Sequence, residues 1–494
     1  MKNVSNSIKQ VMIVFLFCFV ALISYIAYFQ VFSAPAIAEG QGNQRLWAKR
    51  NEVLRGTIYD RNKNPLTQSA RVDALTQKRT YVNGDLYVHA IGYVDPRYGL
   101  TGLEESYDNE LTTYSKLSNN LLNLAKDFSI DKLKDMFENR KEDEDKIGNG
   151  IITTLDPALQ KLAYDALGNN KGAVVALNPK TGEILAMVSK PTYNPNDLEA
   201  SMKAANAGTA DNSPLINRAT SGLYPPGSTF KTVTLSSALE NMPGVTTRTF
   251  NDTGKIVFNG TQSLSNDNGE VNGEINLKDA YRLSSNFVFG TLAMELGNDK
   301  LKATAEKFGF NSSVDSDGLT IAQSQFPKLS KAEVGNIAQS GIGQSSILAT
   351  PMQMALVAST VANDGKMMEP RLVNQVIDKD GNVLKTIGSK VDKQTVISKD
   401  DAAIVKDYMK NLVDSRVDSS WGFFKGTNAA GKTGTADYNL ANGQSATPHS
   451  WFIGFAPADN PKIAVAVIVE NGGYGASAAA PIAGEMMSAA VNNK

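Results

Sequence analysis

Apolar residues form one long run near the start of the chain and shorter runs after it. Residues 11–32 are apolar except for Ser24 and Gln30, and a run of about 20 residues is long enough to cross a bilayer as a helix. Lys2 and Lys9 precede the run, which favours a cytoplasmic N-terminus. Because the run is longer than the roughly 7–15 apolar residues of a cleaved signal sequence, we expect an uncleaved signal anchor.

Two features weigh against this reading of the N-terminus. Residues 36–38, Ala-Ile-Ala, would suit a signal peptidase. Arg45, Lys49 and Arg50 follow the run and weaken its charge asymmetry. A mature protein that starts near Glu39 would contradict the anchor.

The pattern between residues 41 and 149 predicts short strands and turns, followed by charged helical sequence. Residues 121–125 and 133–137 carry apolar residues at helical spacing, which predicts amphipathic helices. Residues 140–146 mix both signs of charge, which is typical of a solvated helix end or linker. We therefore expect a separate N-terminal pedestal domain over residues 33–150.

From residue 151 onward the pattern predicts a single domain that ends at residue 494. Apolar runs at 173–177 and 184–188 flank Lys180-Thr181-Gly182, which indicates two buried strands joined by a hairpin turn. A helical middle follows. Later segments predict three more strands and a closing helix: around Lys432, 451–456, 463–470 and 479–491. Hairpin neighbours favour an α+β fold, with helices packed on both sides of an antiparallel sheet.

Composition narrows the possible functions. The 494 residues are 42% apolar with a net charge of −1, so a sizeable core is possible and no basic surface for nucleic acid is indicated. The single cysteine, Cys18, lies in the long apolar run. It excludes an intrachain disulfide and a cysteine-based zinc site. We expect no metal and no cofactor.

Two histidines, His89 and His449, are the only ones in the chain. His89 lies in a segment that we expect to be a strand or core segment, and His449 precedes a predicted strand. No Gly-x-Ser-x-Gly elbow accompanies either residue. We interpret both as structural.

The first candidate for chemistry is a Ser-x-x-Lys element at Ser228 and Lys231. It follows Tyr-Pro-Pro-Gly and opens a helix-compatible run over residues 232–240. A lysine three residues after a serine lies one turn on, on the same helix face. If that face is buried, the neutral amine is favoured and can act as a base for the serine. A second copy at Ser129 and Lys132 lies in a charged stretch without such an elbow, so the element needs partners.

The second candidate is a Ser-x-Asn element at Ser284 and Asn286. A hydroxyl and an amide two residues apart can relay a proton and bind a substrate amide. The alternative is a polar junction between a helix and a loop, and residues 118–120 fit the same pattern.

The third candidate is Lys432-Thr433-Gly434-Thr435. In a strand, Thr433 and Thr435 share one face and Lys432 and Gly434 the other. Two hydroxyls can hold a carboxylate, the lysine supplies positive charge, and a glycine in an edge strand lets a peptide backbone approach. The similar Lys180-Thr181-Gly182 precedes Ser228 and therefore has the wrong order.

In chain order, the elements of Ser228, Ser284 and Lys432 match the signature of penicillin-binding proteins and class A β-lactamases. Over nearly its whole length the chain resembles a class B penicillin-binding protein, a D,D-transpeptidase of bacterial peptidoglycan. Further segments share the resemblance: residues 55–62, 102–104 with Tyr107 and Leu111, 341–344, 350–353 and 450–455.

The resemblance implies acyl transfer through a serine ester. Ser228 would attack the carbonyl between the two terminal D-alanines of a stem peptide, and Lys231 would take the hydroxyl proton. Ser284 would pass a proton to the departing D-alanine, and Asn286 would hold a substrate amide. β-Lactams would acylate the same serine.

The third element would bind the substrate. Lys432 would supply positive potential near Ser284, Thr433 and Thr435 would bind the terminal carboxylate, and Gly434 would let the substrate backbone approach. The backbone N–H groups of Ser228 and Thr435 would form the oxyanion hole.

The acceptor of the acyl group decides among related functions. An amine gives a cross-link, water gives a D,D-carboxypeptidase or a β-lactamase, and a trapped ester gives a β-lactam sensor. A Glu-x-x-Leu-Asn box, which class A β-lactamases carry, does not follow Asn286. We therefore expect a transpeptidase, held at the cell membrane by residues 11–32 with its catalytic domain outside. The resemblance also implies a membrane glycan polymerase as a partner.

A nucleotide-binding protein with a P-loop is the alternative interpretation from another functional class. Residues 426–433 fit Gly-x-x-x-x-Gly-Lys-Thr, which would bind a nucleotide phosphate at a helix N-terminus. The residues after Thr433 are rich in Gly and Asn and form a poor helix. We therefore expect a strand here and no nucleotide site.

Overall fold

The structure is a computed structural model, and it describes residues 2–30, 44–73, 76–113, 146–208, 213–259, 262–438 and 444–492. The predicted amphipathic helices at 121–125 and 133–137, the charge run at 140–146 apart from Lys146, and the second Ser-x-x-Lys copy lie outside these residues.

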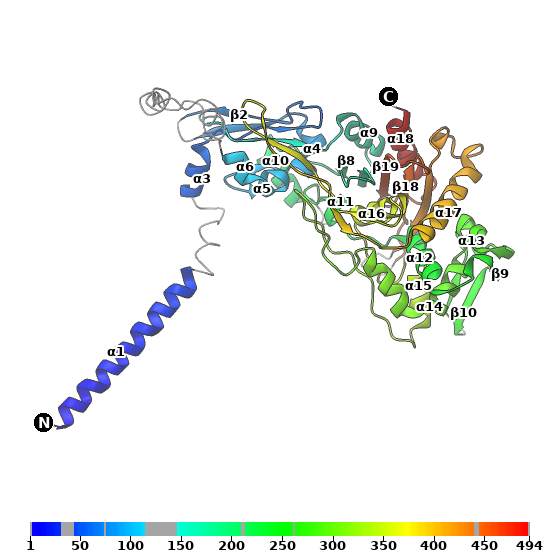
Figure 1. The fold of residues 1–494 in the computed structure, drawn as a ribbon, viewed down its shortest axis with the longest axis horizontal. Coiled ribbons are helices and arrows are strands. Elements are labelled where there is room, and N and C mark those ends of the chain that lie inside the picture. Colours follow the sequence, from blue (N-terminus) through cyan, green and yellow to red (C-terminus); the bar gives the residue numbers. More distant parts are fainter. Residues whose placement is uncertain are drawn as a thin grey trace, which may run out of the picture.

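The apolar run forms α1 (Lys2–Tyr28), shown in dark blue in Figure 1. Its segment Ile8–Tyr28 is long and apolar enough to cross a membrane, and none of that segment is buried in the protein. Cys18 is exposed on this helix. The prediction of a helix here is confirmed up to Tyr28, and residues 31 and 32 lie outside the described part.

The N-terminal part after α1 consists of short elements. They are α3 (Gln44–Asn51), β2 (Thr67–Arg71), β3 (Gln77–Tyr81), α4 (Gly84–Ile91), β4 (Val94–Asp95), β5 (Gly99–Leu100), α5 (Gly102–Ser106) and α6 (Asp108–Thr112). His89 lies in α4, so its segment is a core segment, which was one of the two expectations, and not a strand. The pattern of an apolar run this short fits both a buried helix and a strand. Here the run forms a helix, and Tyr87, Val88 and Ile91 are buried on it.

A buried ion-pair network holds this part together. Both oxygens of the buried Glu104 carboxylate are used: Arg55 Nε donates to one at 2.5 Å and Arg79 Nε to the other at 2.8 Å. Arg55 also pairs with Asp108. The network joins the segments at 55–62 and 102–104 that carried the sequence resemblance.

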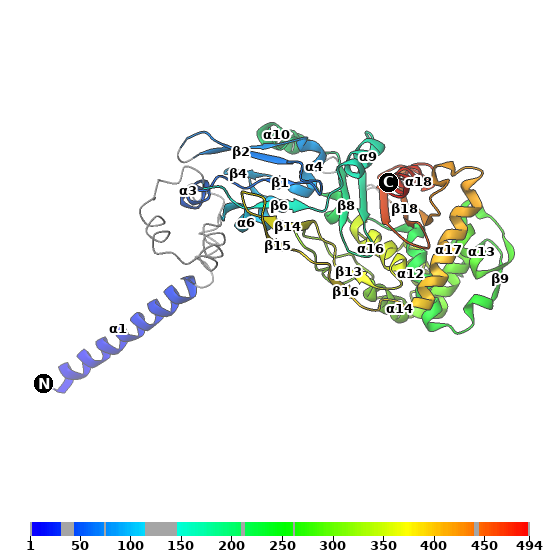
Figure 2. The same ribbon diagram turned by 45° about the horizontal axis from the view of Figure 1, so that its top comes forward.

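A four-stranded sheet connects the chain before residue 150 with the chain after it. Its order is β1 (Ile58–Tyr59), β6 (Gly150–Thr153), β14 (Val373–Ile377) and β15 (Val383–Thr386). β1 and β6 run parallel, and β14 pairs with β6 in the antiparallel direction. Figure 2 shows β1, β6 and β14 side by side.

The predicted antiparallel sheet is present and has five strands. Its order is β17 (Ala430–Ala436), β18 (His449–Ala456), β19 (Ile463–Val469), β7 (Gly172–Leu177) and β8 (Ile184–Lys190), and every neighbouring pair is antiparallel. Lys180 lies in the turn between β7 and β8, as predicted.

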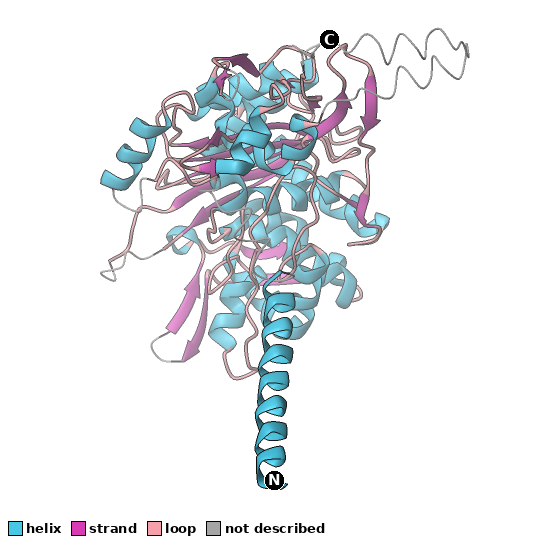
Figure 3. Cartoon of the chain, turned by 90° about the vertical axis from the view of Figure 1, so that its left-hand side faces the viewer, coloured by secondary structure: helices cyan, strands magenta, loops and turns pink. Residues whose placement is uncertain are grey.

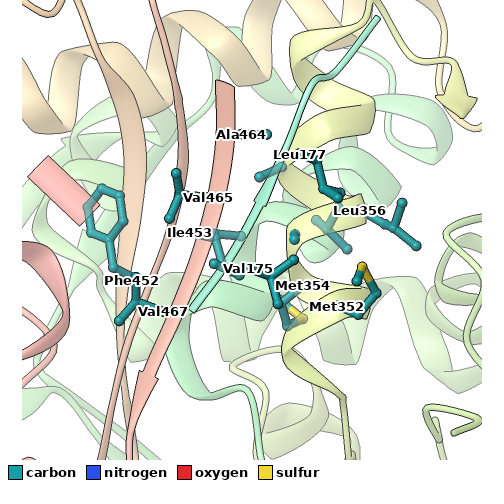
Figure 4. Close-up of a cluster of buried hydrophobic side chains, with 14 of the residues drawn as sticks. Val175, Leu177, Met352, Met354, Leu356, Phe452, Ile453, Ala464, Val465 and Val467 are labelled. Carbon is teal, nitrogen blue, oxygen red and sulfur yellow. The ribbon is translucent and has the colours of Figure 1, made fainter. Parts of the chain in front are cut away.

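Helices cover both faces of this sheet, as predicted. Every residue of β7, β18 and β19 is buried, and because successive side chains point to opposite faces, both faces must be covered. α16 (Pro351–Ala362) and α18 (Ala479–Asn492) contact the central strands, and α9 (Pro157–Leu167) and α17 (Lys399–Val417) contact the edge strands β8 and β17. Figure 3 shows strands and helices intermixed through the body. Figure 4 shows Met352, Met354 and Leu356 of α16 packed near Val175 and Leu177 of β7.

The remaining elements complete the described part of the chain. Those near the candidate residues are η3 (Gly227–Phe230), α12 (Lys231–Asn241), β9 (Thr249–Asp252), β10 (Lys255–Asn259), β11 (Gln262–Ser265), η5 (Asp267–Gly269), β12 (Gly273–Asn276), α13 (Leu277–Leu283) and α14 (Asn286–Lys307). The others are α10 (Leu198–Ala207), α11 (Arg218–Ser221), η4 (Val245–Thr247), α15 (Val334–Ser340), β13 (Met367–Met368), β16 (Val391–Lys393) and η6 (Gly422–Phe424).

Candidate active site

Ser228 lies on the short 3₁₀ turn η3, which runs directly into α12. The turn begins at Gly227, whose φ of 55° is one that side-chain-bearing residues rarely adopt. Its N–H donates to Gly343 O at 3.0 Å, and an added Cβ would lie 2.5 Å from Thr435 O. The turn of Ser228 is therefore held between the loop at Gly343 and strand β17. The segment at 341–344 lies beside the candidate nucleophile, as the resemblance implied.

Lys231 is the first residue of α12 and is fully buried. Its Nζ lies 2.5 Å from Ser284 O, 2.7 Å from Asn286 Oδ1 and 3.1 Å from Ser284 Oγ. The ring of Phe289 covers it at 5.7 Å. The lysine thus joins the first two elements, which are more than 50 residues apart in the sequence.

Ser284 lies at the break between α13 and α14. Its backbone is left-handed, with φ 59° and ψ 37°. The next residue, Ser285, caps α14 by accepting a hydrogen bond from Val288 N. The structure has a junction between two helices here, and not the junction between a helix and a loop that was the alternative. This junction presents Ser284 to the buried amine of Lys231.

Lys432 brings the third element to the same oxygen. It is fully buried in β17, and its Nζ lies 2.9 Å from Ser284 Oγ and 3.2 Å from Thr433 O. Thr433 and Thr435 are partly exposed whereas Lys432 and Gly434 are buried, so the predicted division of faces is confirmed. β17 is an edge strand of the sheet, as predicted for a strand that receives a peptide.

Burial sets the charges of the two lysines. The pKa of Lys231 lies well below that of an ordinary lysine because of burial, and the charge of Lys432 lowers it further, while Asp252 and Asp267 oppose the shift. Burial lowers the pKa of Lys432 to about 7, with a further contribution from Arg416. A neutral amine and an ammonium can therefore coexist at this site near neutral pH.

The two histidines are placed as structural residues. His449 lies in β18, accepts a hydrogen bond from Asn471 N at 3.2 Å and stacks on Tyr438. Burial lowers the pKa of His89 to about 4, so its ring is neutral. Within the described residues, no hydrogen bond joins either histidine to Ser228, Lys231 or Ser284.

One group near the site was not found from the sequence. Asp252, at the end of β9, is fully buried. Its carboxylate accepts hydrogen bonds from Gly254 N, Asn266 Nδ2, Asn272 Nδ2 and Ser285 Oγ. The Asp-Thr-Gly sequence at 252–254 indicates a turn, but nothing local shows that its carboxylate reaches a residue 33 positions away.

The P-loop alternative is wrong. Lys432 lies in the middle of β17, which continues to Ala436. The lysine of a P-loop instead stands at the N-terminus of a helix that follows a strand. Here the lysine amine points to Ser284, and no helix follows within the described residues before β18.

Comparison with known proteins assigns both parts of the chain. Residues 172–488 match the penicillin binding protein transpeptidase domain, and residues 55–142 match the penicillin binding protein A dimerisation domain. Two similar proteins are the peptidoglycan D,D-transpeptidases PbpA of Mycolicibacterium smegmatis and Mycobacterium tuberculosis. They are 34% and 32% identical, with 99% of both chains covered in each case.

Solved structures show the same fold. The imipenem acyl-enzyme complex of penicillin-binding protein A from M. tuberculosis superposes with a TM-score of 0.78 at 32% identity, covering 90% of this chain and all of that one. The D,D-transpeptidase domain of a peptidoglycan glycosyltransferase from Eggerthella lenta superposes with a TM-score of 0.74 at 33% identity, covering 88% of this chain and 98% of that one.

Proposed function

Because this chain belongs to the family of penicillin-binding protein transpeptidases, we propose that Ser228 carries the acyl group in peptidoglycan cross-linking. The protein is a serine-type D,D-transpeptidase that β-lactams acylate. One observation supports the assignment of its residues: Ser284 Oγ lies within hydrogen-bond distance of the amines of both Lys231 and Lys432. The three sequence elements therefore meet at one hydroxyl.

The first half of the reaction forms an ester. Ser228 Oγ bonds to the carbonyl carbon between the terminal D-alanines, and its proton passes to the neutral amine of Lys231. When the tetrahedral intermediate collapses, the C–N bond breaks. Ser284 then delivers a proton to the leaving amine, and Lys231, in contact with Ser284 Oγ, replaces it.

The second half reverses the proton transfers. An acceptor amine attacks the ester carbon, its proton passes to the Ser284–Lys231 pair, and Ser228 leaves with a proton. The charge of Lys432 and the partly exposed Thr433 and Thr435 suit the terminal carboxylate of the donor peptide. The backbone N–H groups of Ser228 and Thr435 form the oxyanion hole, because the turn of Ser228 lies in close contact with strand β17. One such donor can contribute about 2.7–4 kcal/mol.

The organisation of the rest of the chain follows from this activity. Residues 33–150 are a pedestal and residues 151–494 the transpeptidase domain; the family matches at 55–142 and 172–488 fall on either side of that border. Residues 11–32 anchor the chain in the cell membrane, and Lys2 and Lys9 place the catalytic domain outside.

A membrane glycan polymerase is the proposed partner, in contact with α1 and the pedestal. A cross-linker fixed in the membrane acts best where new strands emerge. Replacement of residues 1–32 by an unrelated membrane helix should weaken co-purification of the polymerase. Undiminished co-purification would contradict a contact through α1.

Peptide mass mapping tests the nucleophile. Detergent-solubilised full-length protein should gain one penicilloyl group on the peptide that contains Ser228, and Ser228→Ala should gain none. An adduct on any other serine would overturn the assignment. With a stem-peptide donor and an amine acceptor, cross-linked product should exceed hydrolysed donor; the opposite ratio would indicate a carboxypeptidase.

A further inference from the structure

The segment from β9 to β12 contacts the second catalytic element at consecutive residues. Ser285 Oγ donates to Asp252 Oδ2 at 2.7 Å. Asn286 Nδ2 donates to Ser265 O at 2.8 Å, and Phe287 N donates to Asn266 Oδ1 at 2.9 Å. Three successive residues after Ser284 are therefore tied to one neighbouring segment.

We propose that Asp252 is a positioning residue for acyl transfer, whose buried carboxylate fixes Ser284 and Asn286 against the amine of Lys231. The proposal rests on the function proposed above for Ser284 and Lys231. Asp252 itself does not touch the reacting atoms, because it acts through Ser285 and Asn266.

The carboxylate of Asp252 is held as an anion by neutral donors. Burial alone would raise its pKa, but hydrogen bonds from Asn272, Ser285 and Gly254 outweigh burial and keep the pKa below its usual value. No lysine or arginine of the described residues forms an ion pair with it. An unpaired buried charge is costly, so four separate donor groups converging on it indicate a role beyond a simple turn.

The hydrogen bonds of Asp252 support the backbone on both sides of Ser284 and Asn286. Ser284 has a left-handed backbone, which residues with a side chain rarely adopt, so its neighbours must hold it. Ser285 does so from one side, since its hydroxyl both donates to Asp252 and accepts from Val288 N. Asn266 donates to the same carboxylate and accepts from Phe287 N, which fixes the other side of Asn286.

The charge of Asp252 also affects the pKa of Lys231. The carboxylates of Asp252 and Asp267 face Lys231 and raise its pKa, against burial and the charge of Lys432; Lys432 in turn faces Arg416. Removal of the charge of Asp252 should therefore lower the pKa of Lys231. The pH at which Lys231 becomes a base would then move to lower values.

Asp252→Asn tests both consequences, with Asp60→Asn as the matched control. Asp60 is equally buried and accepts hydrogen bonds from Asn62 N, Asn64 N and Asn64 Nδ2, but it lies in the N-terminal part. The measurement is the second-order rate constant for acylation of the full-length protein by a fluorescent penicillin, as a function of pH. At its optimal pH, D252N should be acylated at least tenfold more slowly than the wild type. The acid limb of its pH–rate profile should lie at lower pH. D60N should be acylated at a rate within twofold of the wild type.

A rate for D252N within twofold of the wild type would overturn the proposal. So would a slower rate with an unmoved acid limb, because that is the result of a merely structural role. If D252N does not melt cooperatively, Ser285→Ala decides: it cuts the link to Asp252, and a wild-type rate would again overturn the proposal. Ser228→Ala is assayed in parallel. Labelling of S228A would show that the proposed function fails, whereas a blank S228A with a normal D252N would show that only this inference fails.

Discussion

Lys432 Nζ lies 2.9 Å from Ser284 Oγ, although the two residues are 148 positions apart in the sequence. The same oxygen is 3.1 Å from the amine of Lys231. Two ammonium groups around one hydroxyl repel each other, and burial of both lysines adds to the cost of charge. The site therefore favours one neutral amine beside one ammonium, which is the division of charge that a base and a carboxylate-binding group require.

This division of charge predicts how stability depends on pH. An unfolded lysine keeps its proton up to about pH 10.4, whereas the pKa of folded Lys432 is about 7. Between these values the unfolded chain binds more protons, so the free energy of unfolding should rise with pH, by up to about 1.4 kcal/mol per pH unit for one group. Urea denaturation between pH 7 and 9.5 measures the rise.

Lys432→Met should make that rise less steep, because one of the two buried lysines whose pKa is lowered in the folded state is gone while Lys231 remains. Lys203→Met, at an exposed position on α10, is the control and should follow the wild-type curve. A K432M curve as steep as the wild type would show that Lys432 is charged in the folded protein at pH 8.

The hydroxyl of Ser284 should matter independently of its backbone. Ser284→Ala removes the acceptor shared by the two lysines, and acylation by a fluorescent penicillin should slow by about 10²–10⁴-fold. Ser284→Gly also lacks the hydroxyl but suits the left-handed backbone. It should be as slow as S284A, with a higher melting temperature. A rate for either variant above one third of the wild type would contradict the proton relay.

Gly434 determines how closely β17 approaches the nucleophile turn. An added Cβ would lie 2.9 Å from Pro226 O and 3.1 Å from Thr229 N, so Gly434→Ala should push the turn of Ser228 away from the strand. Acylation should fall at least tenfold, and the melting temperature should fall as well. Gly422→Ala is the control, because a Cβ there meets nothing within 4 Å. Equal acylation rates for G434A and G422A would show that this contact is unimportant.

The buried network of the N-terminal part should contribute strongly to stability. Glu104→Gln leaves the guanidinium groups of Arg55 and Arg79 buried without their shared carboxylate. Breaking a buried pair in this way costs about 3–5 kcal/mol, measurable as a lower free energy of unfolding. The exposed pair of Arg97 and Glu199 provides the control: Glu199→Gln should change stability by less than about 1 kcal/mol. Similar losses in both variants would contradict this ranking.

Sequence patterns predicted the sheet, its hairpin turn at Lys180 and the faces of β17 because these depend on neighbours in the chain. The segment of His89 was predicted to be a strand or a core segment and is a buried helix, since a short apolar run fits both a buried helix and a strand. The P-loop match failed for the opposite reason: its residues fit, but Lys432 lies within a strand.

The sequence by itself determined the identity and order of the three elements, the membrane-length helix and the alternation that buries Lys432 while exposing Thr433 and Thr435. Only the tertiary structure decided that Ser284 is shared by two lysines and that Asp252 supports it through Ser285. The physical reason is burial. Local patterns fix which face of an element is apolar, but the charge of a lysine or a carboxylate depends on groups that packing brings to it from distant parts of the chain.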